Sequence, residues 1–279
     1  MSDTAFQTQY RQEFIHGFEF RQSLLRSCTI NEAVIKGNTA TFLVADSGSA
    51  TAVTRGTNGL IPARADNNTQ SSATLAEWHD LVRKTGFNVF ASQGDQRRIM
   101  QETTMAVINR KIDLDIIAQL DTATHNTGTA VPASISLIAK SLSALGYNYV
   151  PTDEQDNMFG LISPAFQAYL YQTTEFANAQ YVDVKPFAGP VRKMQRWMGI
   201  NWIVHPLLTG ANTNSEKCYL YHRNAIGHAV NTSGMDAPVG YDQEQDYSWA
   251  RVSMFMGSKM LQQGGVIQMV HDASAYTVA

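Results

Sequence analysis

The sequence predicts an α+β fold, in which strands and helices are mixed without a regular βαβ repeat. Residues 34–46 and 73–90 are rich in β-branched side chains and alternate in polarity, which is typical of strands. Over residues 92–124 apolar residues recur at helical spacing instead. After residue 126, patterns of short helices and short strands follow one another irregularly.

The first 33 residues (1–33) predict an amphipathic N-terminal arm. Its aromatic side chains form a roughly helical stripe that is interrupted by Gly17. These side chains either line the core of the domain or lie on a neighbouring subunit. Phe14 and Phe18 are therefore candidates for contacts between subunits.

Residues 34–90 predict a long, extended, two-stranded arm. The segment between the two strand patterns is rich in Gly, Ser, Thr and Asn, and a compact domain seldom tolerates so long a loop without a function. Arg55 and Arg64 lie on this arm. A guanidinium group can bind a neighbour's carboxylate through two parallel hydrogen bonds, so both arginines are candidates for inter-subunit contacts. The alternative is that they are simply exposed loop residues.

A long helix is predicted over residues 92–124, with Ser92 and Asp95 in the spacing of a helix cap. Further helices are predicted at 133–146 and 163–172, the second with Ser163 as N-cap and Pro164 in the first position. The remaining predicted strands are 157–163, 198–206, 217–222 and two within 247–272, joined around Gly264 and Gly265.

The composition favours extensive protein interfaces. Charged residues make up 16% of the chain, below the usual quarter, and Asn, Gln, Ser and Thr occupy many polar positions. These groups cost less than Lys or Glu to remove from water, although a lineage bias in amino-acid usage would give the same pattern. The net charge of -3, without a stripe of Lys and Arg, argues against a protein that mainly binds nucleic acid.

The two cysteines, Cys28 and Cys218, are far apart in the sequence and predict neither a disulfide framework nor a metal site. This usage suits a reducing cytoplasm. The N-terminus lacks the pattern of a secretory signal, and no apolar stretch approaches the length of a membrane span. We therefore expect a soluble protein that does not bind a membrane.

Glu77, His79 and Asp80 lie within four positions, as ligands or acid/base groups often do. In a strand, Glu77 and His79 share one face and Asp80 points to the other. Two ligands are a weak indication of zinc, because a catalytic zinc site needs a third and none is predictable here. We interpret the three residues as contacts to a hinge or a neighbouring subunit; the alternative is a metal or acid/base site around His79.

Other chemical patterns are incomplete. Residues 242–253 begin like a calcium loop but lack the Gly and Glu that an EF-hand requires. His222 and His228 are interpreted as structural, and Asp113 and Asp115 as a solvated or subunit-facing edge of the long helix. The sequence contains no nucleophile elbow, phosphate-binding loop or zinc-protease motif. No catalytic residue, cofactor or metal is predicted, and the protein is expected not to be an enzyme.

The order of these segments resembles that of tailed-bacteriophage major capsid proteins with the Hong Kong 97-type fold. Residues 74–120, beginning "TLAEWHDLVRKTGF", resemble the second strand of the family's arm leading into its spine helix. Residues 199–230, beginning "GINWIVHPLLTG", resemble a central-lobe strand followed by a loop and a strand that re-enters the peripheral lobe. The resemblance covers nearly the whole chain and rests on the order and spacing of the segments.

The resemblance implies self-assembly into hexamers and pentamers of an icosahedral shell. The shell would enclose packaged double-stranded DNA without sequence-specific binding, and it would form in the host bacterial cytoplasm and become part of the virion. The implied parts are an N-terminal arm (1–33), an E-loop with its return strand (34–90), a P-domain spine helix (91–126), an A-domain (127–215) and closing P-domain and A-domain segments (216–279).

One departure from the family concerns covalent cross-links. Some relatives join subunits by an isopeptide bond from an E-loop lysine, but this sequence has no lysine between Lys36 and Lys84. The shell is therefore expected to depend on noncovalent contacts or on decoration proteins. No long N-terminal scaffold segment is present, so a separate scaffolding protein is expected. A portal protein is a further expected partner. The alternatives are an encapsulin-type compartment and an enzyme that uses Glu77, His79 or Asp242.

Overall fold

The computed structural model describes residues 22–31, 33–47, 50–65, 67–91, 95–177, 194–231 and 234–276. The chain divides into two compact units. Among the described residues, unit 1 contains Gln22, Ser23, Ala76–Asp113 and Val230–Met256, and unit 2 contains those within Leu24–Leu75, Leu114–Ala229 and Gly257–Ala279. None of the helices in the described ranges is both long and apolar enough to cross a membrane.

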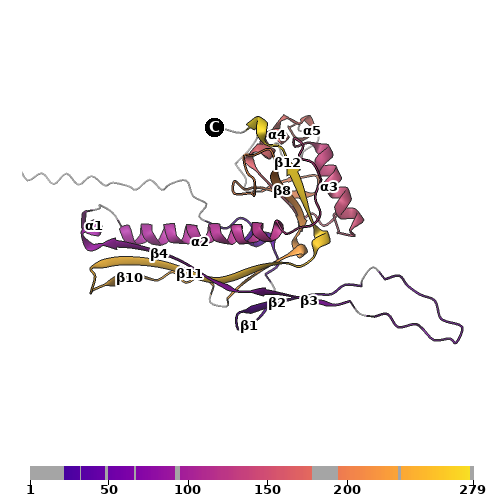
Figure 1. Cartoon of the computed structure of the whole chain (residues 1–279), viewed down its shortest axis with the longest axis horizontal. Helices are drawn as coiled ribbons and strands as arrows, with labels where there is room; N and C mark the ends of the chain where they lie inside the picture. The colour runs from indigo at the N-terminus through magenta and orange to yellow at the C-terminus, as the bar shows by residue number, and fades with distance from the viewer. Residues whose placement is uncertain are drawn as a thin grey trace, which may run out of the picture. The chain divides into compact units, whose positions relative to one another are not determined.

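Unit 1 is built on a long antiparallel strand pair. β4 (Ala76–Thr85) pairs with β11 (Tyr247–Met260), with Thr85 opposite Tyr247 and Ala76 opposite Met256. β10 (Val239–Asp242) pairs with the other edge of β11. The helices α1 (Gly86–Ala91) and α2 (Gln96–Leu120) follow β4 in the chain (Figure 1). The predicted return strand is thus β4, but it pairs with β11 rather than with the outgoing strand of the arm.

The predicted long helix is confirmed as α2, whose 25 residues span about 37 Å at 1.5 Å per residue. Asp95 caps it, because its Oδ1 accepts a hydrogen bond from the Arg98 amide at 3.2 Å; Ser92 lies outside the described residues. Its buried side chains recur every fourth residue along one face, which is the spacing that a helix needs to cover a core. They include Met100, Thr104, Ile108, Ile112 and Ile116.

The prediction that Asp113 and Asp115 form a solvated edge of this helix was wrong for Asp113. The Asp113 side chain is buried, and its Oδ1 accepts a hydrogen bond from Ser23 Oγ at 2.5 Å. Asp115 is half-buried and accepts one from Ser258 Oγ at 2.6 Å. Hydroxyl partners explain why these carboxylates tolerate positions away from water.

The base of the predicted arm is a three-stranded antiparallel sheet in unit 2. β1 (Val34–Lys36) turns at Gly37, whose φ is 61°, into β2 (Thr39–Val44), and β2 pairs with β3 (Thr69–Thr74). Ala40, Phe42 and Ala73 alternate into a small core with Ala229. The described residues from 45 to 68 lie outside any strand, because they offer no alternating apolar face to bury. The arm is therefore two-stranded only near its base.

A five-stranded sheet forms the second part of unit 2. Its strand order is β12 (Val266–His271), β8 (Glu216–His222), β5 (Met158–Ile162), β7 (Ile200–Val204) and β6 (Met194–Trp197), and only β5 and β7 run parallel. The other elements of unit 2 are α3 (Ile135–Tyr147), α4 (Pro164–Gln172), α5 (Thr174–Ala177), β9 (Ile226–Val230), which pairs with β11, and four 3-10 helices, η1 (Arg26–Cys28), η2 (Arg223–Ala225), η3 (Gln263–Gly265) and η4 (Ser274–Tyr276).

The core of this part contains large side chains from both strands and helices. Every residue of β5 is buried, and so are Tyr219, Tyr221 and Phe166. A Cβ atom on Gly160 would lie 2.5 Å from the Trp202 ring, so only glycine fits where these strands approach. The predicted cap of α4 is confirmed, since Ser163 Oγ accepts a hydrogen bond from the Phe166 amide at 3.0 Å.

The α+β class predicted from the sequence is confirmed by these mixed sheets and helices. The two C-terminal strands that were predicted around Gly264 and Gly265 exist as β11 and β12, but they belong to different sheets. The strand periodicity of these two segments was visible in the sequence. The strands with which they pair could not be read from it.

Candidate assembly surfaces

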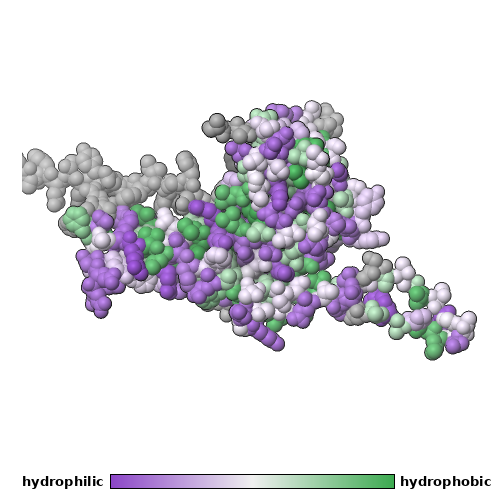
Figure 2. All heavy atoms as spheres, in the orientation of Figure 1, coloured by the Kyte–Doolittle hydropathy of each residue, from purple (hydrophilic) through white to green (hydrophobic). Residues whose placement is uncertain are grey.

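The residues between β2 and β3, here called the arm loop (residues 45–68), expose apolar side chains. Figure 1 shows the loop running beyond the ends of both strands, and Figure 2 shows hydrophobic side chains along it. Val53, Leu60 and Ile61 are 60%, 74% and 66% exposed. Apolar side chains gathered on an exposed loop are typical of a binding surface.

The tip of the arm loop has a defined turn that separates the roles of the two candidate arginines. The Gly56 amide donates to the Leu60 carbonyl at 3.0 Å, and Arg55 Nη1 donates to the Gly59 carbonyl at 3.4 Å. Arg55 therefore supports its own loop. Arg64 is exposed and forms no hydrogen bond or ion pair with the described part of the chain, so its guanidinium is available to another molecule.

The outward face of β4 carries Glu77 and His79, as the alternation predicts. His79 Nε2 lies 2.6 Å from Glu77 Oε1, and the two side chains are 42% and 61% exposed. They line a shallow hollow of 360 Å³ in unit 1, together with Asp236, Arg251 and Phe255. We call this surface the β4–β11 hollow. Arg251 and Asp236 form a long ion pair across it, with 3.8 Å between Nη2 and Oδ2.

Glu77 and His79 form a single imidazole–carboxylate pair in the β4–β11 hollow. Among the described residues, Glu77 and His79 do not belong to any group of three potential metal ligands. An exposed ion pair of this kind contributes at most about 1 kcal/mol, because water screens it. The pair therefore contributes little to the stability of unit 1.

The opposite face of β4 packs on α2. Lys111 Nζ lies 3.8 Å from the centroid of the Trp78 ring, and Lys84 Nζ donates to Gln96 Oε1 at 2.5 Å. Asp80 alternates with Trp78 and therefore shares this face. Burial raises the pKa of Asp80 above its ordinary value, because a partly desolvated carboxylate favours its neutral form. Of the three residues grouped in the sequence, Asp80 is thus separated from Glu77 and His79.

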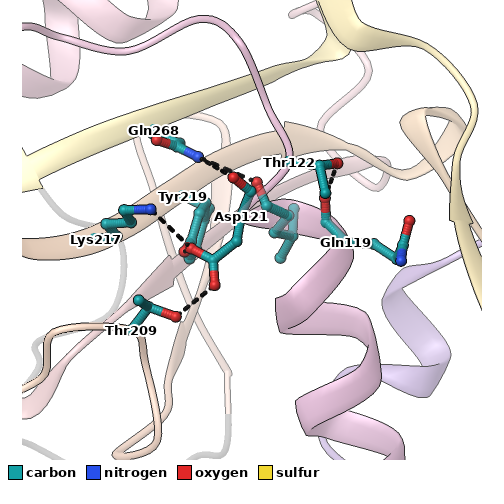
Figure 3. A network of polar contacts seen from close by, with 8 residues as sticks. Gln119, Asp121, Thr122, Thr209, Lys217, Tyr219 and Gln268 are labelled. Atoms are coloured by element: carbon teal, nitrogen blue, oxygen red, sulfur yellow. Dashed lines mark hydrogen bonds and ion pairs between the residues drawn. The ribbon is translucent and has the colours of Figure 1, made fainter.

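The C-terminal end of α2 is held by a polar cluster around Asp121, which no local sequence pattern predicts (Figure 3). Its carboxylate accepts hydrogen bonds from Tyr219 OH at 2.5 Å and Thr209 Oγ1 at 2.5 Å, and Lys217 Nζ lies 3.3 Å away. Burial, followed by the bond to Asp121, raises the pKa of Tyr219. A carboxylate at a helix C-terminus is unfavourable beside the unpaired carbonyl groups, so these three donors are needed to hold it there.

Gln268 completes the same helix end from β12. Its Nε2 donates to the carbonyl of Asp121 at 3.0 Å and to that of Leu120 at 3.4 Å, two of the carbonyls that a helix leaves without a partner. The alternation of Lys217 and Tyr219 on β8 was readable in the sequence, but their meeting with Gln268 depends on strand pairing that was not.

The remaining candidates from the sequence have structural surroundings or lie outside the described residues. His222 and His228 are both buried; His222 Nδ1 accepts from the Asn224 amide and His228 Nδ1 lies 2.9 Å from Ser258 Oγ. Asp242 accepts hydrogen bonds from the amides of its own turn, which occupies its carboxylate. Phe14 and Phe18 lie outside the described residues.

Comparisons with known proteins show which family shares these features. The family described as phage capsid protein matches residues 2–273. No curated protein sequence matches the chain significantly.

Solved structures show the same fold at low sequence identity. The structure of Mycobacterium phage Che8 has a TM-score of 0.73 and 14% identity, and the match covers 96% of this chain and 98% of that one. The capsid of cyanophage P-SCSP1u has a TM-score of 0.66 and 13% identity over 96% and 93% of the two chains. The capsid of Ralstonia phage GP4 has a TM-score of 0.63 and 12% identity over 98% of each.

Proposed function

This chain belongs to the phage capsid protein family, and from that premise we propose that its arm loop and its β4–β11 hollow form contacts between copies in the shell of a phage head. The protein is a major capsid protein with the Hong Kong 97-type fold, a structural component of the virion that assembles with its own copies. The family and these solved structures do not favour the encapsulin alternative.

The single observation that carries the proposal is the exposed apolar turn of the arm loop. Leu60 and Ile61 are more than half exposed in the isolated chain, and covering them would stabilise a contact by about 25 cal/mol per Å² of apolar surface removed from water. A subunit ring can close as five or six copies, and a contact carried on a long loop tolerates the change in angle. We assign the arm loop to the E-loop of the family.

The remaining parts of the proposal follow the family. Residues 91–126 are assigned to the P-domain spine, 127–215 to the A-domain and 216–279 to the closing segments, with hexamers and pentamers as the assembling rings. The shell would enclose double-stranded DNA, and the acidic balance of the chain would keep the packaged genome from adhering to the wall. A separate scaffolding protein, a portal and decoration proteins are the expected partners, assembly would take place in the host cytoplasm, and no enzymatic activity is expected.

The test is electron microscopy of the purified protein, expressed alone and with candidate scaffolding proteins. We expect polyhedral shells, tubes or capsomer rings. Leu60→Asp with Ile61→Asp should abolish them while the far-UV circular dichroism stays unchanged. The matched control is Thr51→Asp, which places one charge on a polar exposed position of the same loop. A wild-type protein that stays monomeric with every candidate scaffold would contradict the proposal, and so would shells formed equally well by the double variant.

A further inference from the structure

Three potential metal ligands meet inside unit 2. Glu216 and Cys218 lie two residues apart on β8 and therefore share one face of the sheet. His271 on β12 is the direct cross-strand partner of Glu216, so its side chain lies on the same face. All three are buried, with 1%, 0% and 0% of their surface exposed.

The contacts of this cluster leave one polar atom without a partner. His271 Nδ1 lies 3.1 Å from Glu216 Oε2, and Ser163 Oγ donates to the same oxygen at 2.8 Å. His271 Nε2 is buried and forms no hydrogen bond with the described residues. One ligand atom from each of Glu216, Cys218 and His271 lies within 4.8 Å of the other two. A buried polar atom without a partner calls for an explanation such as an unseen ion.

We propose that Glu216, Cys218 and His271 bind a zinc ion inside the capsid subunit. Sulfur, imidazole nitrogen and carboxylate oxygen are the ligands that zinc takes in proteins, at about 2.0 to 2.3 Å. Ligand atoms in a tetrahedral site are then roughly 3.3 to 3.8 Å apart. Atoms that now lie up to 4.8 Å apart therefore need to approach by about 1 to 1.5 Å. Ser163 Oγ donates to the Glu216 carboxylate and so positions one of these ligands.

Binding converts the Cys218 thiol to a thiolate and releases one proton to solvent, while Glu216 binds as the carboxylate and His271 as the neutral imidazole. No oxidation is involved. The ion would join β8 to β12 and, through Ser163, to the beginning of α4. Its role would be to stabilise unit 2, because a ligand that binds only the folded state adds its binding free energy to stability.

The test uses the full-length protein, purified without a metal-affinity tag. Elemental analysis should find zinc in proportion to protein after dialysis, and refolding with cobalt should give the near-ultraviolet absorption of a thiolate–cobalt bond. Cys218→Ser should remove that absorption and lower the zinc content at least about tenfold, the effect of losing about 1.4 kcal/mol of binding free energy. Cys28→Ser, at the other buried cysteine, should change neither.

The wild-type measurement keeps the proposal falsifiable even if a variant fails to fold. The proposal would be overturned if the wild type contained far less than one zinc ion per chain and showed no thiolate absorption after cobalt treatment. Glu216 and His271 would then be a buried hydrogen-bonded pair without a metal. An equal loss of the cobalt–thiolate absorption in Cys28→Ser and Cys218→Ser would also overturn the proposal. The absorption would then not depend specifically on the sulfur of Cys218.

Discussion

Lys111 holds its ammonium group 3.8 Å from the centre of the Trp78 ring, on the face of β4 opposite to Glu77 and His79. Both residues belong to unit 1, and the contact joins α2 to β4. The two faces of this strand have different surroundings. One face of β4 contacts the long helix through Trp78 and Lys84, and the other face exposes Glu77 and His79.

Lys111→Met should lower the free energy of unfolding by about 1 kcal/mol, since it keeps most of the packed stem but removes the attraction between the cation and the ring. Chemical unfolding followed by circular dichroism measures the change. Lys259→Met is the matched control, because Lys259 is exposed and forms no hydrogen bond or ion pair within the described residues. Equal effects of the two substitutions would show that the ring contact contributes nothing specific.

Asp80→Asn should stabilise the protein at neutral pH. Burial raises the pKa of Asp80 from its ordinary 3.8, so the folded state binds the proton more tightly than the unfolded state. Stability contributed by this group is then lost as the pH rises from about 3.8 through the raised pKa. The gain from the substitution should be largest at pH 7 and should shrink towards pH 4. Urea unfolding of both proteins across this range measures it, and a gain that grows on acidification would contradict the assignment.

Asp121→Asn should cost about 2 kcal/mol of the free energy of unfolding, because an amide presents a donor where Tyr219, Thr209 and Lys217 already donate. Thermal and urea unfolding measure the loss. Asp153→Asn is the control, since Asp153 is an exposed loop residue whose side chain has no hydrogen bond or ion pair in the described ranges. A loss no greater than that of the control would mean that the cluster does not hold the helix end.

Much of the fold was predictable because periodicity is a local property. The alternation in β4, the four-residue spacing in α2 and the Ser163–Pro164 cap each lie within a few residues of one another, and each is confirmed. Asp113 was misjudged because its partner, Ser23, is remote in the sequence. A polar side chain is solvated or buried according to such a partner, which no local pattern reveals.

The candidate site was predictable only in part, for the same reason. The opposite orientations of His79 and Asp80 follow from strand alternation and are observed. The cluster of Asp121 with Lys217 and Gln268 depends on the register of β8 and β12, which brings together residues from three distant segments. The roles of Arg55, Arg64, Glu77, His79 and Asp80 between subunits stay predictions.

Glu77→Gln combined with His79→Gln should leave folding intact and weaken assembly. Both side chains are more than 40% exposed, so the change in unfolding free energy should stay within about 0.5 kcal/mol. If a neighbouring copy covers the β4–β11 hollow, the double substitution should remove about 1.4 kcal/mol of the binding free energy of that contact. Each association between two copies would then be about tenfold weaker. Light scattering during assembly measures the change. Glu244→Gln, on the exposed turn after β10, is the control. If the wild type, the double variant and this control assemble indistinguishably, the hollow is excluded as a contact between copies.

Arg64 should matter more for assembly than Arg55. Arg55 already donates to the carbonyl of Gly59 within its own turn, whereas Arg64 has no partner among the described residues. Arg64→Ala should therefore reduce the yield of shells without changing the isolated subunit, and Arg64→Lys should restore little, because an ammonium group cannot form the two parallel bonds of a guanidinium. Arg55→Ala should act instead by loosening the turn, which hydrogen exchange of the Gly56 amide detects before assembly begins. A full shell yield in Arg64→Lys would show that only the positive charge at this position matters. An unchanged shell yield in Arg64→Ala would show that Arg64 makes no contact between subunits and is simply an exposed loop arginine.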